Sequence, residues 1–143
     1  MNGGFTKALL QTLDRMMPAR GAAHLVTGRH GEEEAYFYLR KLGYVMVARN
    51  WRSPRRRGEI DLIGWDQGVL CFVEVKTRAA RTLVPGEAAV DGEKQRELSG
   101  MARDYLRRVS PTPAVRFDVL SIYVQARGGA PDITLFRNAF TLS

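Results

Sequence analysis

The sequence has few of the residues from which disulfides, zinc sites and reactive thiols are built. Its 143 residues include one cysteine, Cys71, so no disulfide can form within the chain, which suits a reducing compartment. Cys71 lies in the apolar run VLCFVEV and is interpreted as a small core residue. The two histidines, His24 and His30, have no cysteine partners and are too few for a zinc site. The motifs G-x-S-x-G, G-x-x-x-x-G-K-[ST] and G-x-G-x-x-G are absent as well, which argues against the hydrolases and nucleotide-binding proteins that use them.

Long apolar runs are also missing. No stretch approaches the length that spans a bilayer. The first twenty residues carry Asp14 and Arg15 within their apolar part and lack a convincing signal-peptide cleavage site. We therefore expect a cytoplasmic protein with no membrane partner.

Negative charge is the scarcer of the two signs. The chain has 22 Lys+Arg against 15 Asp+Glu, a formal net charge of +7, and a pI of about 10.1. Its 45% hydrophobic and 26% charged residues are ordinary for a globular domain. The positive excess favours polyanionic partners, with nucleic acid ahead of an anionic membrane surface, but charge alone does not identify the partner.

The hydrophobic pattern predicts one α/β domain at residues 21–143, preceded by a short amphipathic helix at residues 1–20. A break follows that helix at Arg20-Gly21. Two further helices are predicted, at 30–42 and 93–109, with Gly43 ending the first. The predicted strands cover residues 44–51, 59–65, 69–77, 114–124 and 133–140, with a turn at 66–68 and a loop at about 78–92. This order indicates a mixed central β-sheet flanked by helices.

Two adjacent strands carry the charged residues of greatest interest. Alternate side chains of a strand point to opposite faces, so Glu74 and Lys76 share one face, and Glu59 and Asp61 share one face of the preceding strand. If the strands pair through the turn at 66–68, Asp61 lies near Phe72 or Glu74, depending on a register that the sequence does not fix.

Two carboxylates with a lysine alongside suit phosphodiester hydrolysis. A hard divalent cation such as Mg²⁺ is held by one or two carboxylates, activates water and neutralises phosphoryl charge, while a lysine stabilises the developing negative charge. The alternative is a structural ion pair between Glu74 and Lys76. Because buried charge without a role is costly, the position of these residues beside an apolar strand and Asp61 favours the metal site.

GEIDLIGWDQGVLCFVEVKTR resembles the YraN family of predicted bacterial endonucleases, within the PD-(D/E)xK nuclease superfamily, and is distantly similar to archaeal Holliday-junction resolvases. The resemblance covers roughly residues 28–140 and extends to GEEEAYFYLRKLGYVMVARNWR, EKQ, RFDV and NAF. Ile60 stands where the wider superfamily often has proline. The fold implied is a restriction-endonuclease-like α-β-β-β-α-β core.

The resemblance implies specific roles for the residues of the two strands. Asp61 and Glu74 would be ligands of Mg²⁺ or Mn²⁺, with the Val75 carbonyl as a third, and Lys76 would be the catalytic lysine.

Two helix residues, Glu32 and Gln95, would complete the site. Both lie on the packed faces of their helices, but Glu32 is equally well explained as a first-turn carboxylate that complements the helix dipole. Lys94, next to Gln95, could reach phosphate or be solvated.

Basic residues surround the proposed site and are candidates for nucleic-acid binding. They are Arg52, Arg55, Arg56, Arg57, Arg78 and Lys94. A solvated loop is the alternative. Glu59 could support the metal site or pair with the preceding arginines. Trp51 is interpreted as a core residue, and Arg116 and Asp118 as a structural pair.

Three functional hypotheses follow. The first is a Mg²⁺- or Mn²⁺-dependent endonuclease acting on DNA, with branched or structured DNA as one candidate substrate. The second is a non-catalytic nucleic-acid-binding module of the same fold. The third is an assembly protein whose N-terminal helix mediates contacts. A homodimer would suit a two-fold symmetric substrate.

Overall fold

The computed structural model describes residues 20–79, 89–124 and 129–143, with the side chains of the first helix described from His30 onward. The helix predicted at residues 1–20 lies outside this range. The elements in chain order are α2 (Arg20–Lys41), β1 (Val45–Trp51), β2 (Ile60–Asp66), β3 (Val69–Ala79), α3 (Gly92–Leu106), β4 (Ala114–Val124) and β5 (Asp132–Phe140). None of the described helices has the length and apolar character that a bilayer crossing requires.

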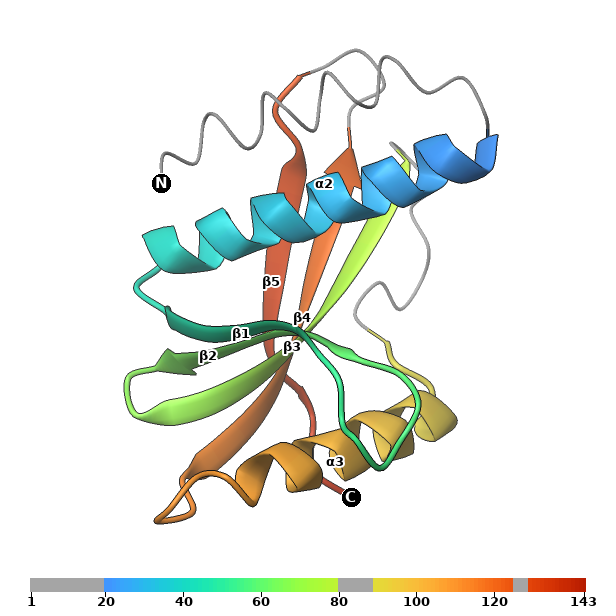
Figure 1. The fold of residues 1–143 in the computed structure, drawn as a ribbon. Helices are drawn as coiled ribbons and strands as arrows, with labels where there is room; N and C mark the ends of the chain where they lie inside the picture. The colour runs from blue at the N-terminus through green and yellow to red at the C-terminus, as the bar shows by residue number, and fades with distance from the viewer. Residues whose placement is uncertain (1–19, 80–88, 125–128) are drawn as a thin grey trace.

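The strands form one mixed sheet in the order β1-β2-β3-β4-β5 (Figure 1). Neighbouring strands are antiparallel except β3 and β4, which are parallel. The exception follows from the chain path, because a parallel neighbour needs a crossover, and α3 lies between these two strands in the sequence. The predicted α/β fold with a mixed sheet is confirmed.

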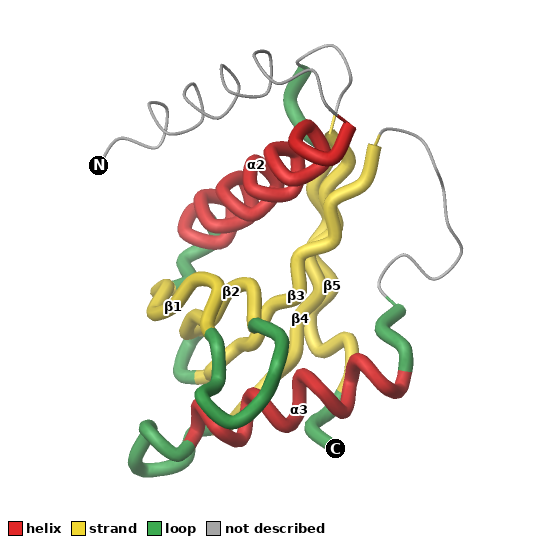
Figure 2. Tube along the Cα trace, turned by 45° about the vertical axis from the view of Figure 1, so that its right-hand side comes forward, coloured by secondary structure: helices red, strands yellow, loops and turns green. Residues whose placement is uncertain are grey.

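Two apolar clusters fill the two sides of the sheet. Leu98, Met101 and Ala102 of α3 pack against residues that include Phe72 and Phe117. Ala35 and Leu39 of α2 pack with residues of the sheet on the other side. Figure 2 shows the consequence, with the sheet between α2 and α3.

The first described helix is longer than predicted. It begins at Arg20 instead of residue 30 and contains Gly21, Gly28 and Gly31, so the expected break at Arg20-Gly21 is wrong. A helix tolerates glycine where tertiary packing compensates its low propensity. Gly31 has such a contact, because a Cβ atom there would lie 2.1 Å from Oγ1 of Thr77 in β3.

The predicted helix stop at Gly43 and the predicted turn between the second and third strands are confirmed, whereas α3 ends at Leu106, three residues before its predicted end. Gly43 has a positive φ of 98° directly after α2, the conformation expected of a helix-ending glycine. Asp66 pairs with Val69 across a two-residue turn in which Gln67 and Gly68 have φ values of 49° and 83°. Two positive φ angles are typical of the tight hairpin turn whose twist matches that of the strands.

Candidate metal centre

The register of β2 against β3 decides where Asp61 lies. Leu62 pairs with Val73, so the next step along the ladder brings Asp61 to Glu74 and not to Phe72. The Val75 backbone N–H donates to Oδ2 of Asp61 at 2.8 Å. In a strand the N–H and C=O of one residue point toward the same neighbouring strand, so the Val75 carbonyl is also directed toward β2. The register that was open in the sequence is therefore the one that brings the two acids together.

Three carboxylates meet at this point. Glu32 of α2, Glu59 and Asp61 each offer an oxygen atom, and these atoms all lie within 4.8 Å of one another. We call these three residues the carboxylate cluster. Gly31 precedes Glu32, and its missing side chain lets α2 approach Thr77 of β3 closely. Glu74 lies near the carboxylate cluster, since the charges of Asp61 and Glu32 both act on it.

Burial and mutual repulsion raise the pKa of these carboxyl groups. Burial is the largest cause at Asp61, whose pKa rises to about 6 even though the Val75 N–H favours its charged form. The pKa of Glu74 rises to about 7 through burial and then the charge of Asp61. The pKa of Glu32 also rises to about 7, through burial followed by the charges of Asp61 and Glu59. The site thus concentrates negative charge that a cation would relieve.

Two lysines border the site, and their interactions differ. The positive charge of Lys94, in the first turn of α3, lowers the pKa of both Asp61 and Glu74. Lys76 donates a hydrogen bond from Nζ to the backbone carbonyl of Ala89. Its pKa is lowered by burial and then by the charge of Arg78. Lys94 was predicted either to reach phosphate at the site or to be solvated, and the structure favours the position at the site.

The ion pair proposed as an alternative for Glu74 and Lys76 is not formed among the described residues. The charge of each still acts on the other, so the two lie close together, as the predicted site requires. Gln95 has a different contact from the one expected. Its Nε2 donates to the Val90 carbonyl at 2.7 Å, so it holds the chain that enters α3. Its supporting role for the site stays a prediction.

The predicted basic residues have varied surroundings. Arg52 is exposed and pairs with Glu59 at 3.3 Å, so Glu59 both joins the carboxylate cluster and pairs with a preceding arginine. Arg55 and Arg57 are exposed. Arg56 pairs with Asp104 of α3 at 3.1 Å, and Arg78 donates to Ser121 at 3.5 Å. Their binding to nucleic acid stays a prediction.

Comparison with known proteins identifies the family of this chain. The model of the uncharacterised protein family UPF0102 matches residues 31–122, a range that includes the carboxylate cluster, Glu74 and Lys94. The chain belongs to the UPF0102 family. It is 46% identical over 140 residues to a UPF0102 protein of Koribacter versatilis, covering 97% of this chain and 96% of that one. UPF0102 proteins of Solibacter usitatus (50% over 114 residues; 79% and 84% covered) and Porphyromonas gingivalis (42% over 121 residues; 85% and 88% covered) are similar too.

UPF0102 is the YraN family, so the resemblance found in the sequence is confirmed. The names of these UPF0102 relatives state no activity.

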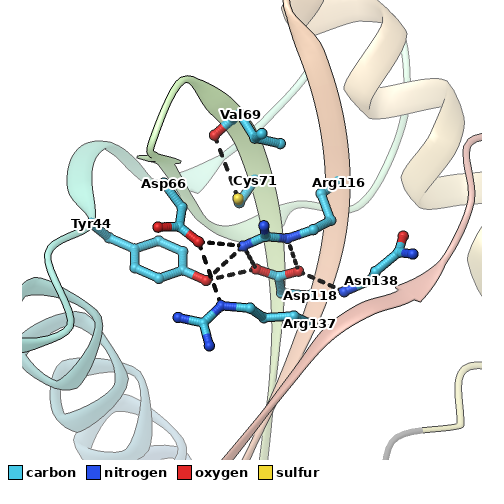
Figure 3. Close-up of polar contacts among 8 residues, drawn as sticks. All are labelled: Tyr44, Asp66, Val69, Cys71, Arg116, Asp118, Arg137 and Asn138. Atoms are coloured by element: carbon cyan, nitrogen blue, oxygen red, sulfur yellow. Dashed lines mark hydrogen bonds and ion pairs between the residues drawn. The ribbon is translucent and has the colours of Figure 1, made fainter.

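A second polar group in this UPF0102 chain is structural (Figure 3). Arg116 donates from Nε to Oδ1 of the fully buried Asp118 at 2.8 Å and from Nη2 to Asp66 and Tyr44. The Tyr44 hydroxyl donates to Oδ2 of Asp118 at 2.9 Å, and the Asn138 backbone N–H donates to Oδ1 of Asp118 at 3.0 Å. These contacts join the start of β1 and the strands β2, β4 and β5. The predicted structural pair of Arg116 and Asp118 is confirmed.

Cys71 and Trp51 fit the interpretations drawn from the sequence. Cys71 is fully buried, and burial, followed by the charge of Asp118, raises the pKa of its thiol to about 12. A thiol with such a pKa carries almost no thiolate at neutral pH. Trp51 packs edge-on against Tyr105, with ring centroids 5.3 Å apart.

Proposed function

We propose that this UPF0102 protein is a divalent-metal-dependent endonuclease that hydrolyses phosphodiester bonds in DNA. The carboxylate cluster carries the proposal. Oxygen atoms of Glu32 in α2, of Asp61 in β2 and of Glu59 just before β2 lie within 4.8 Å of one another in a partly buried site. Charged carboxylates at this separation repel one another, and a cation bound between them would relieve that repulsion.

The donor set fits Mg²⁺ or Mn²⁺. Hard cations take oxygen ligands, and on an octahedral Mg²⁺ neighbouring ligand oxygens lie about 3 Å apart and opposite ones about 4 Å apart. Glu32, Glu59 and Asp61, whose oxygens lie within 4.8 Å of one another, would therefore need only small side-chain rotations to close on the ion. Glu74 and the Val75 carbonyl are the neighbouring oxygen donors.

A bound divalent cation would supply Lewis acidity that activates water and neutralises phosphoryl charge. The chain's own groups would do the rest. Glu74, which lies beside the carboxylate cluster, would be placed to accept a proton from an attacking water. Lys94 and Lys76 bring positive charge that would offset the charge of the phosphate.

One observation favours a second candidate, a module that binds nucleic acid without cutting it. The Lys76 ammonium group is already engaged by the Ala89 carbonyl, and that hydrogen bond would have to open before Lys76 could contact a phosphate. In such a protein the carboxylate cluster would bind a structural cation.

The deciding experiment is a cleavage panel over single-stranded, duplex, flap and four-way DNA with Mg²⁺ or Mn²⁺. Asp61→Asn and Glu74→Gln keep the shape of the side chain and remove its charge, and the exposed Asp132→Asn is the matched control. The proposal predicts metal-dependent cleavage by the wild type and the control, and a loss of at least a hundredfold in the two site variants. Isothermal titration calorimetry with Mn²⁺ should show the parallel loss of metal binding in Asp61→Asn. Cleavage that both site variants retain would refute the proposed site, and metal binding without cleavage of any substrate would support the second candidate.

A further inference from the structure

The loop at residues 52–58 is attached to α3 through one buried acid. Ser53 Oγ donates to Oδ2 of Asp104 at 2.5 Å, and Arg56 Nε donates to the same oxygen at 3.1 Å. The Asp104 side chain is only 4% exposed. The Arg55 backbone N–H donates in turn to Ser53 Oγ at 3.1 Å. Figures 1 and 2 both show this connection between β1 and β2 lying against α3, and Arg56 is the arginine of the loop that contacts that helix through Asp104.

Arg56 occupies space that a side chain of α3 would otherwise fill. A Cβ atom on Gly100 would lie 2.8 Å from Cζ of Arg56, so the guanidinium group rests directly on this glycine. Positions 96, 100, 103 and 107 follow one stripe of a helix, since residues three and four apart are neighbours. Arg56 therefore lies between Arg96 and Arg103 on the surface of α3.

Arg107 extends the same stripe. It is the C-cap of α3 with helical backbone angles. The hydrogen bond from Ser53 lowers the pKa of Asp104 most, against the raising effect of burial, and the charges of Arg56 and then Arg107 lower it further. We call Arg96, Arg56, Arg103 and Arg107 the arginine row. With a rise of about 1.5 Å per residue, eleven residues of helix give the row a length of about 16 Å.

The surroundings of the arginine row favour a charged polymer over a membrane. Asp104 is buried and already paired, while Glu97 shares a surface hollow with Arg56, Arg57 and Gly58. None of the exposed large apolar side chains of the described residues belongs to the loop or to α3. A surface that inserts into a bilayer needs such side chains, so the arginine row lacks what membrane binding would use.

We propose that the arginine row binds the sugar-phosphate backbone of a nucleic-acid duplex arm that leads away from the carboxylate cluster. A row of about 16 Å is long enough to reach several phosphates of a duplex backbone. Lys94 lies in the first turn of the same helix, two residues before Arg96, and its charge acts on Asp61 and Glu74, so α3 connects the two surfaces. This surface deepens the proposed nuclease function by locating the substrate arm, but binding along the row does not itself depend on cleavage.

The test is binding of a fluorescein-labelled 20-base-pair DNA duplex, measured by anisotropy in EDTA over a series of salt concentrations. The double variant Arg103→Gln/Arg107→Gln removes two charges of the row. Its matched control, Arg40→Gln/Lys41→Gln, removes two charges from the last turn of α2, on the other side of the sheet. Each lost phosphate contact lowers the slope of log affinity against log salt by about 0.9. In the row variant we expect the magnitude of this slope to fall by about 2 and the affinity at 100 mM salt to fall about tenfold or more. The control should keep the slope of the wild type.

Equal losses in the two double variants would mean that only net charge matters and would overturn the proposal, as would unchanged binding in the row variant. Vesicles containing phosphatidylserine form a further arm. Binding to them as tight as to DNA, and lost in the same variant, would overturn the choice of nucleic acid.

Gly100→Ala tests the place of Arg56 without removing a charge. The Cβ atom of alanine would displace the guanidinium group of Arg56. The higher helix propensity of alanine offsets part of the stability lost when the Arg56–Asp104 contact loosens, so the variant should still fold. We expect about threefold weaker DNA binding, and we expect Glu97→Gln to strengthen binding by a similar factor. Full affinity in Gly100→Ala would remove Arg56 from the row.

The outcomes separate this inference from the proposed function. Cleavage by the wild type, together with unchanged binding by the row variant, would refute the arginine row and leave the nuclease proposal standing. Lost binding in the row variant, together with no cleavage by the wild type, would support the arginine row and refute the nuclease proposal.

Discussion

Removing the charge of Asp61 should stabilise the metal-free protein. The pKa of Asp61 rises from its ordinary 3.8 to about 6, chiefly through burial. One pH unit of difference between folded and unfolded pKa corresponds to about 1.4 kcal/mol, so the charged form costs the folded state up to about 3 kcal/mol at pH 8. Because the side chain is partly accessible and water screens some of this cost, we expect Asp61→Asn to gain about 1–2 kcal/mol. The asparagine Oδ1 can still accept from the Val75 N–H.

The pH dependence of this gain has a definite sign. A carboxyl group whose folded pKa is raised contributes no cost below its unfolded pKa and its full cost above its folded pKa. The advantage of Asp61→Asn should therefore be complete above about pH 7 and shrink between pH 6 and pH 4, the interval set by the pKa values of about 6 and 3.8.

Metal should reverse the order of stability. A ligand at one hundred times its dissociation constant stabilises the folded state by about 2.7 kcal/mol. The wild type should gain this from Mg²⁺ or Mn²⁺, whereas Asp61→Asn should gain little.

The assay is thermal unfolding followed by circular dichroism at pH 8 and pH 4.5, in EDTA and in 10 mM Mg²⁺. For a chain of this size a gain of 1–2 kcal/mol raises the melting temperature by about 3–8 °C. Asp132→Asn, on an exposed side chain, serves as the control and should be neutral. An Asp61→Asn protein that melts below the wild type in EDTA at pH 8 would refute the reasoning, because it would show that the carboxylate is satisfied by its protein neighbours.

Three further predictions concern affinity and packing. Since Glu32 and Glu74 have pKa values of about 7, the affinity for Mn²⁺ should fall as the pH drops from 8 to 5.5. Calorimetry in two buffers at pH 6.5 should detect proton release when Mn²⁺ binds. Binding without proton release would contradict the raised pKa values. Gly31→Ala should destabilise the protein by about 1–3 kcal/mol in urea unfolding, because its Cβ would lie 2.1 Å from Thr77 Oγ1, and adding Thr77→Ala should recover most of the loss; no recovery would place the strain elsewhere. Asp118→Asn should cost about 2 kcal/mol by the same assay, since it removes the charged acceptor of the Arg116 Nε hydrogen bond and leaves Asp66 as the carboxylate partner of Arg116. A change within the range of Asp132→Asn would show that the network contributes little.

The elements of this fold could be predicted because their signals are local. The alternation along β2 and β3 and the turn at Gln67 and Gly68 depend only on neighbouring residues. The start of α2 could not be predicted in this way. Its glycines argue locally against a helix, and at Gly31 the helix packs against Thr77, which belongs to a strand far along the chain.

In the candidate site, too, local patterns could be predicted and long-range packing could not. Asp61 and Glu74 could be paired from strand alternation once a hairpin was assumed, but only the ladder itself selects Glu74 over Phe72. Glu59 shares a strand face with Asp61, and this signal was available, although it left the partner of Glu59 open. The position of Lys94 depends on how α3 packs against the sheet, which no local pattern determines.

The buried polar network shows the limit most clearly. Arg116 and Asp118 are two residues apart and could be paired from the sequence. Their contacts with Tyr44 and Asp66 join residues separated by 72 and 50 positions, and only the assembled sheet brings them together.

The burial of Cys71 has a practical consequence for studying this chain. Because the one native thiol is fully enclosed and its pKa is raised to about 12, maleimide reagents should leave it untouched while the protein is folded. A cysteine introduced on the surface, for example by Asp132→Cys, would then take up a fluorophore or spin label selectively. Distances to a labelled DNA duplex could be measured this way without first replacing a residue of the core.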